Sequence, residues 1–301
     1  LLPFLAIGVV VLGSLCSGSA GLAADVVAPY EQILKARNIQ ATSSALGQFL
    51  KDLHPSNEQR ARAKALIEQL GDLESFQSRE AAMSELLSMR TLPTELLIAA
   101  SHGESAEVRW RARRVLEIGK PEATLQAVLK VIESKRIGGI IPELLAAVPL
   151  CEELNLVQSA QVAIEATANN RDAHVLRQAL TNENSVIRVT AATALAAVVG
   201  EEAKKDLSEL LDDETDEVQL AAARAIANFG DRKALPVLAA LLESEALHVR
   251  GSASAALRQL SGIQFAFAAY DKLDKRAAAA KKWRNWVVGE GRTAKLTFPI
   301  D

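Results

Sequence analysis

The feature of this sequence that most constrains its fold is an apolar pattern that returns about every 31 residues. In the segment from Val218, apolar residues stand at offsets 0, 4, 7, 8 and 11, which places them in one stripe along a helix. Successive copies start 30, 48, 31, 31 and 31 residues apart, a spacing typical of stacked helix pairs and incompatible with a coiled-coil heptad. The pattern therefore predicts an all-α fold, an α–α solenoid. The copies begin at Ser78, Val108, Leu156, Ile187, Val218 and Val249.

Further signals mark the ends of the predicted helices and their partners. A proline lies 13 to 15 residues before three of the stripes, where it suits the first turn of a partner helix; these are Pro93, Pro142 and Pro236. The 48-residue interval has room for an additional helix at about residues 122–134, which predicts one three-helix unit. Glycines follow four stripes, so we expect a left-handed residue to end each of those helices. They are Gly119, Gly200, Gly230 and Gly262.

Composition agrees with thin, closely packed helix pairs. Hydrophobic residues make up 49% of the 301 residues, but only 4% are aromatic, so a thick core of large side chains is not expected. Alanines in the stripes let neighbouring helices approach closely. The formal net charge of −3 lacks the basic excess that binding to nucleic-acid phosphates requires. We therefore expect no nucleic-acid partner.

The first 24 residues have the pattern of an export signal. Residues 1–16 are uncharged and mostly apolar, and the residues that follow up to Ala24 are mostly small. Small residues at the required distances favour cleavage after Ala20 or Ala23, which would leave a mature N-terminus between Gly21 and Asp25. A periplasmic or secreted protein without membrane contact is then expected. The alternative is an uncleaved N-terminal helix that anchors the chain in a membrane.

These signals divide the chain into four predicted segments. They are a signal peptide at 1–24, an N-terminal linker and cap at 25–56, a repeat solenoid at 57–262, and a C-terminal capping helix and tail at 263–301. Trp283 and Trp286 lie three residues apart on a helix predicted at about 272–288, so both indoles share one face. We expect this face to cover the end of the last repeat.

The residues of the chain offer little for catalysis. The four histidines are dispersed, and the two cysteines, Cys16 and Cys151, have no neighbouring histidine or cysteine at metal-ligand spacing. No glycine-rich phosphate loop and no nucleophile-elbow motif occurs in the sequence. We therefore expect a protein that is not an enzyme and that binds no cofactor and no metal.

One strip of residues on the predicted repeats is a candidate binding surface. Trp110 lies two residues into its stripe helix, nearly opposite the apolar stripe, where core packing does not explain a large ring. Equivalent positions in the other repeats are partly apolar, and arginines lie nearby. The strip suits a protein or peptide partner. The predicted partner-binding residues are Trp110, Arg113, Arg114, Val189, Leu220 and Arg224.

The segment from Val108 to Leu116, with the pattern Val-Arg-x-x-Ala-x-x-Val-Leu, resembles a HEAT repeat, as do its relatives at Ile187 and Val249. The repeats are short and rich in alanine, similar to those named after the phycobilisome lyases. Residues 30–290 resemble exported bacterial HEAT-repeat proteins without an assigned activity. HEAT repeats often carry an aspartate six residues before the arginine; here only Asp213 and, more weakly, Asn182 occupy that position, so no continuous Asp–Arg ladder is expected.

The resemblance implies a fold but does not by itself imply a function. We expect a non-enzymatic scaffold for protein–protein interactions. Two alternatives remain open: a repeat spacer module of a larger envelope protein, and a lyase-related HEAT protein that binds a tetrapyrrole.

Overall fold

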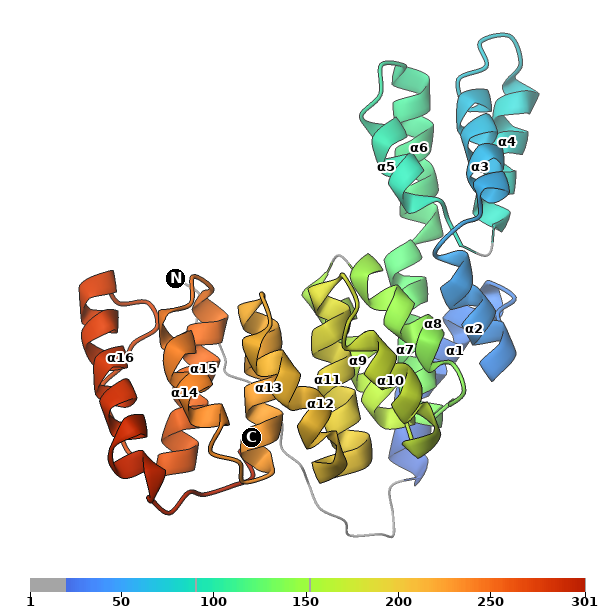
Figure 1. Cartoon of the computed structure of the whole chain (residues 1–301). Coiled ribbons are helices and arrows are strands. Elements are labelled where there is room, and N and C mark those ends of the chain that lie inside the picture. Colours follow the sequence, from blue (N-terminus) through green and yellow to red (C-terminus); the bar gives the residue numbers. More distant parts are fainter. Residues whose placement is uncertain (1–19, 90, 152, 301) are drawn as a thin grey trace. The chain divides into compact units, whose positions relative to one another are not determined.

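The computed structural model describes residues 20–300, except residues 90 and 152. These residues form helices joined by turns, without a strand among them (Figure 1), so the fold is the predicted all-α repeat solenoid. The chain divides into two compact units after Ala168. We call residues 18–168 the N-terminal unit and residues 169–301 the C-terminal unit. Most of the predicted signal peptide, residues 1–19, lies outside the described residues.

Helices of the N-terminal unit pack mainly in pairs. Helix α3 packs on α4, α5 on α6, and α4 on α6, whereas α1 and α2 pack on α7 and α8. The predicted linker at 25–56 is therefore largely helical. The helices are α1 (Ala20–Ala36), α2 (Ser43–Asp52), α3 (Asn57–Gln69), α4 (Phe76–Ser88), α5 (Thr94–Ser101), α6 (Ala106–Gly119), α7 (Pro121–Lys135), α8 (Ile141–Ala147) and α9 (Leu154–Thr167).

The C-terminal unit repeats the same arrangement more regularly. Helix α13 lies between α11 and α15 and contacts both, while the short helices α12 and α14 pack beside it. The helices are α10 (Ala173–Ala179), α11 (Ser185–Val199), α12 (Lys204–Glu209), α13 (Asp216–Asn228), α14 (Ala234–Ala240), α15 (Leu247–Ser261) and α16 (Leu273–Val288). The boundary between the units falls inside the array predicted at 57–262.

The apolar stripes form the cores of both units, as their period predicts. Val218, Ala222 and Ile226 of α13 are fully buried, and their counterparts on the other stripe helices are buried at most positions. Because the stripe positions include alanine, the neighbouring helices approach closely without large side chains. Fully or nearly fully buried counterparts include Ala82, Leu86, Ala112, Val115, Ala160, Ala163, Ile164, Ala191, Ala194, Leu195, Val249, Ala253, Ala256 and Leu257.

The arginine after the first stripe residue ties the preceding turn to its helix. Arg188 donates to the carbonyl oxygens of the residues six and five positions earlier at 2.8 and 3.1 Å. Arg250 does the same at 2.7 and 2.8 Å, and Arg109 at 2.9 and 2.6 Å. The guanidinium group supplies several donors in a fixed geometry, so one side chain satisfies two turn carbonyls. The repeated arginine is therefore a structural residue of the repeat.

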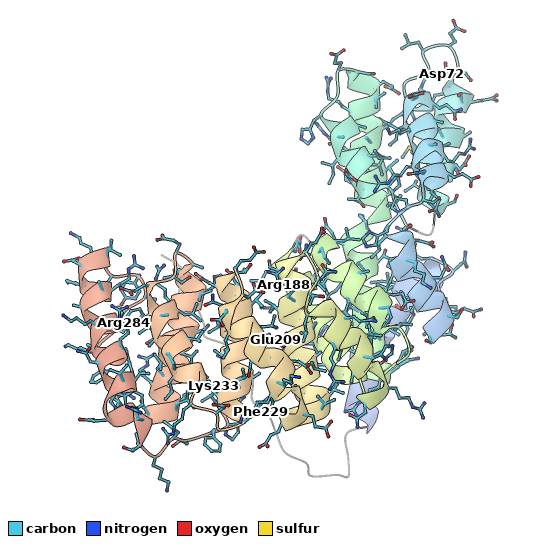
Figure 2. The ribbon with its side chains drawn as sticks, in the orientation of Figure 1. Asp72, Arg188, Glu209, Phe229, Lys233 and Arg284 are labelled. Atoms are coloured by element: carbon cyan, nitrogen blue, oxygen red, sulfur yellow. The ribbon has the colours of Figure 1, made fainter. Side chains whose placement is uncertain are left out.

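One Asp–Arg rung is present in the C-terminal unit. Arg188 on α11 donates to both carboxylate oxygens of Asp213 at 2.9 and 2.8 Å, and both side chains are less than 10% exposed. Figure 2 labels Arg188 among the helices of this unit. The Asp213 hydrogen bond raises the pKa of Arg188 and outweighs burial, which lowers it. The rung links two successive repeats, because its residues lie 25 positions apart.

Three of the four glycines predicted to end helices have a positive φ angle, and one does not. Gly200, Gly230 and Gly262 have positive φ angles of 57°, 73° and 71°. Gly119 is instead the last residue of α6, and Lys120 takes the left-handed conformation, with φ 41°. A side chain at Gly119 would collide with Leu92, so close packing rather than backbone conformation accounts for glycine there.

The C-terminal tryptophans are buried where α16 packs at the end of the C-terminal unit. Helix α16 packs on α14, and Trp283 and Trp286 are both buried. The Trp283 ring makes edge contacts with Phe265 and Trp286, with ring centres 4.8 and 5.7 Å away. Such edge-to-face contacts stabilise aromatic clusters beyond simple burial.

Candidate interaction surfaces

Helix α6 of the N-terminal unit presents an exposed tryptophan. The Ser105 side chain accepts a hydrogen bond from the Val108 N–H at 3.4 Å and fixes the start of the helix. Ala112 and Val115 then face the core, and Trp110 lies on the other side, 59% exposed. An exposed indole of this size marks a surface that can bury apolar area against a partner.

Trp110 belongs to a cluster in which two exposed rings lie beside the Arg111 guanidinium; Arg79 also lies 5.7 Å from the centre of one of them, Phe76. The Arg111 guanidinium lies 5.8 Å from the Trp110 ring centre and 5.9 Å from the ring centre of Phe76, which is 63% exposed. Glu80 and Glu107 each accept from Arg111 at 2.6 Å. Burial alone would lower the pKa of Arg111, but these two hydrogen bonds raise it above its ordinary value. We call Phe76, Trp110 and Arg111 the aromatic cluster.

The predicted Arg113 and Arg114 extend this surface. Both are exposed, and their spacing from Trp110 places the three side chains on one side of α6. Arg113 donates to the Ser101 carbonyl at 3.1 Å, whereas Arg114 makes a half-exposed ion pair with Glu117 at 3.2 Å. Exposed pairs of this kind contribute little to stability, so Arg114 can exchange Glu117 for a partner at small cost.

The other three predicted residues belong to the C-terminal unit. Val189 on α11 and Arg224 on α13 are half-buried. Leu220 is only 9% exposed, which corrects the expectation that it lies on an accessible strip. Its position is opposite the stripe of α13, but α13 is packed against four other helices, α11, α12, α14 and α15. The six predicted residues are therefore divided between the two units.

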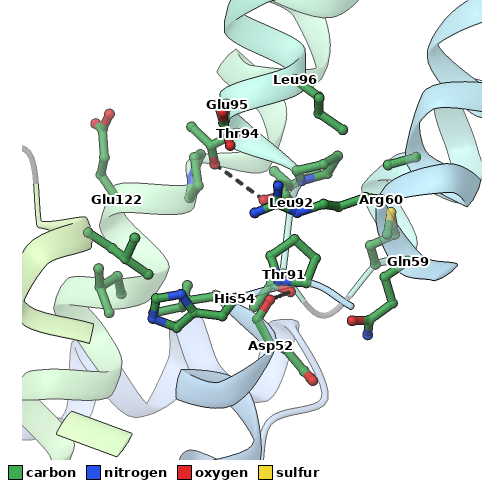
Figure 3. A pocket seen from close by; sticks show the side chains of 18 of the residues that line it. Asp52, His54, Gln59, Arg60, Thr91, Leu92, Thr94, Glu95, Leu96 and Glu122 are labelled. Carbon is green, nitrogen blue, oxygen red and sulfur yellow. Dashed lines mark hydrogen bonds between the residues drawn. The ribbon is translucent and has the colours of Figure 1, made fainter. Parts of the chain in front are cut away.

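The N-terminal unit also contains a cleft that the sequence analysis missed. It has a volume of about 410 Å³ and lies where α3, the segment before α5, the end of α2 and the start of α7 meet (Figure 3). Its apolar lining includes Leu53, Leu92, Leu125, Leu150 and Leu156. These residues come from turns and helix ends that are far apart in the sequence. Helical periodicity carries no signal for such a cleft.

Charged and polar residues also line the cleft. Arg60 and Lys64 on α3 line it together with three carboxylates, Glu95, Glu122 and Glu153. The Thr91 hydroxyl donates to the Asp52 carbonyl at 3.0 Å and joins two of its sides. Such a site can hold a few apolar side chains with charges at its edge.

Residues 20–300, without 90 and 152, include no group of three or more His, Cys, Asp or Glu side chains placed to hold a metal ion. Over the same part of the chain, none of the helices combines the length and apolar character needed to cross a bilayer.

Comparison with known families identifies the class of repeat. The family described as HEAT repeats matches residues 204–287, which extend from α12 into α16 of the C-terminal unit. Residues 204–287 are therefore similar to HEAT repeats, within a chain that folds as an all-α repeat solenoid. No curated protein matches its sequence.

Proposed function

We propose that this chain is a non-enzymatic scaffold that binds a partner protein or peptide through the exposed side of α6. HEAT repeats generally serve as protein-interaction scaffolds, and the match at residues 204–287 supports this general role. The observation that carries the specific proposal is the aromatic cluster, in which two largely exposed rings flank the buried cation of Arg111.

The geometry of the cluster favours an apolar partner surface. Arg111 is held by Glu80 and Glu107, so its charge is already balanced within the chain. Rigid aromatic side chains lose little conformational entropy on binding, and Trp and Arg are enriched at the energetic centres of interfaces. Arg113 and Arg114 add donors at the edge for carboxylates or carbonyls of the partner.

Capture of a partner protein by the purified chain and by its variants tests this proposal. The double variant Trp110→Ala/Arg114→Ala removes one ring and one edge cation, while the core residues of α6 stay unchanged. Truncation of such a central residue typically costs at least about 2 kcal/mol, or roughly 30-fold in affinity. The expected result is loss of the captured partner at unchanged helical content. Tyr270→Ala is the matched control, because Tyr270 is an exposed aromatic residue of the C-terminal unit.

Capture and a separate bilin-binding assay distinguish the scaffold from its alternatives. Retained capture of the partner by the folded double variant would direct the search to the cleft or to the C-terminal unit. Binding of a bilin pigment in the second assay would support the lyase-related alternative. A spacer module would capture no partner with either the unmodified chain or the variants.

We further propose that the protein is exported. The apolar residues 1–16 and the small residues that follow support cleavage after Ala20 or Ala23. N-terminal sequencing of the exported product should therefore begin between Gly21 and Asp25. Recovery of the uncleaved chain in washed membranes would support the N-terminal anchor instead.

A further inference from the structure

The cleft of the N-terminal unit has an aliphatic lining and a size that suits a short apolar segment. Its walls come from α3, the end of α2, the segment before α5 and the starts of α7 and α9. The lining includes the buried Leu125 and Leu156 and also Leu150, which is 38% exposed. A volume of about 410 Å³ is in the range of sites that enclose a small ligand or a few side chains.

The three carboxylates that line the cleft are explained by the helices on which they lie. Glu95 and Glu122 belong to the first turns of α5 and α7, and Glu153 immediately precedes α9. The N-terminus of a helix carries a partial positive charge, so negative side chains at these positions stabilise the helices. The fold therefore accounts for the three carboxylates without a ligand.

The two cations that line the cleft have no such role in the fold. Arg60 lies near the start of α3, where the helix dipole disfavours a positive charge, and Lys64 follows one turn later on the same face. Both are exposed, and within the described part of the chain neither has an ion-pair partner, whereas Arg62 of the same helix pairs with Glu85 at 2.7 Å. Figure 3 shows Arg60 directed from α3 into the cleft, with Glu122 on the opposite side. These two cations are available for an anionic group of a ligand.

We propose that the cleft binds the C-terminal end of a partner polypeptide. The free carboxylate of that end pairs with Arg60 and Lys64, and its last apolar side chains enter the aliphatic lining. Gln59 and Thr94 also line the cleft and offer an amide and a hydroxyl group to the peptide backbone. The three glutamates on the other sides repel a carboxylate, so the charged end of the ligand is directed toward α3.

The charge and the enclosure of the cleft favour a chain end over an interior segment. A chain end places a carboxylate directly beside its last side chains, as the positions of the cations and the leucines require. An interior segment has to leave the cleft at both ends, although helices and turns bound it on several sides. The proposal goes beyond the α6 surface and shares no residue with it.

A short synthetic peptide tests the proposal by fluorescence anisotropy on the full chain at low ionic strength. Its sequence is Gly-Ser-Gly-Leu-Leu-Leu, with fluorescein at the N-terminus and a free carboxylate. The same peptide with a C-terminal amide lacks only that negative charge and should bind at least about 10-fold more weakly. A free-acid peptide with serine in place of each leucine should also bind at least about 10-fold more weakly, because it buries little apolar area.

Variants of the chain locate the bound carboxylate. Arg60→Gln/Lys64→Gln should weaken binding of the free-acid peptide at least about 10-fold and remove its advantage over the amide. The matched control is Arg62→Gln/Lys51→Gln, which removes two exposed cations outside the lining and should bind the peptide as the unmodified chain does. If the first double variant loses helical signal, the comparison of acid and amide peptides on the unmodified chain still decides.

Three results would overturn the proposal. They are no saturable binding of the free-acid peptide, equal binding of the acid and the amide, and unchanged binding by the folded Arg60→Gln/Lys64→Gln chain. Trp110→Ala should leave peptide binding unchanged. Loss of peptide binding in that variant would assign the peptide to the α6 surface and would also overturn the assignment to the cleft.

Discussion

Removal of the Asp213 carboxylate should strongly destabilise the C-terminal unit. Asp213 accepts two hydrogen bonds from Arg188 at 2.8 and 2.9 Å and one from the Thr215 N–H at 2.9 Å. The side chains of Arg188 and Asp213 are only 7% and 9% exposed, so Asp213→Ala leaves a buried guanidinium without its counterion. Arginine cannot lose its proton at neutral pH to relieve this cost.

The burial of the Arg188–Asp213 pair determines how much Asp213→Ala destabilises the unit. Removal of one partner of a buried ion pair costs about 3–5 kcal/mol, and exposed Glu214, 3.5 Å from Arg188, compensates little. The matched control is Asp206→Ala, which breaks the Arg177–Asp206 pair of the same unit at 2.8 Å. Those side chains are 41% and 32% exposed, so that change should cost at most about 1 kcal/mol.

Hydrogen exchange measured by mass spectrometry compares the loss of stability in the two variants, helix by helix. Peptides from α11 and α13 should exchange more than about 100-fold faster in Asp213→Ala than in the unmodified chain, given about 1.4 kcal/mol for each factor of ten. Peptides from α4 and α6, in the other unit, serve as internal controls. Equal exchange in Asp213→Ala and Asp206→Ala would refute the argument that burial determines the strength of this ion pair.

Two further predictions concern the cores. Ala222 is fully buried, so Ala222→Leu should overpack the core around α13 and lower the free energy of unfolding of the C-terminal unit by about 1–3 kcal/mol. Ala197→Leu, at an exposed position of α11, is the control and should change this free energy little. Thermal melting compares the two variants, and equal melting temperatures would contradict the assignment of Ala222 to the buried stripe. Burial raises the pKa of the Cys151 thiol to about 11, so Cys151 in the folded chain should react with iodoacetamide at pH 8 far more slowly than in denaturant. Mass spectrometry of the Cys151 peptide measures the two rates, and equal rates would place the thiol at the surface.

Local periodicity predicts the helices and their buried faces well. The stripe from Val218 and its copies are buried because each lies on one helix, where offsets of four, seven and eight residues meet the same side. The Trp110 position is also a local property, since its angle from the stripe of α6 determines its exposure. Leu220 shows the limit of this reasoning, because the neighbouring helices of α13 determine its burial.

Contacts between distant residues were not predictable from the sequence. The cleft contains the contact of Thr91 with Asp52, 39 residues apart, and the last described residues are held by the contact of Ile300 with Asn228, 72 residues apart. Neither pair belongs to the repeat, so the period of the stripes does not bring them together. The same holds for Gly119, whose close contact with Leu92 depends on how α6 packs against the segment before α5.

Photo-crosslinking from α6 tests the central claim, that a partner binds the aromatic cluster, most directly. The variant Arg114→p-benzoylphenylalanine places a reactive group on the exposed side of α6 and leaves Trp110 and Phe76 intact. The prediction is a crosslink to the captured partner that disappears when Trp110→Ala is added. The same group introduced at Tyr270 should give none. Equal crosslinking from positions 114 and 270, or a crosslink that persists without Trp110, would contradict the assignment of the partner surface to α6.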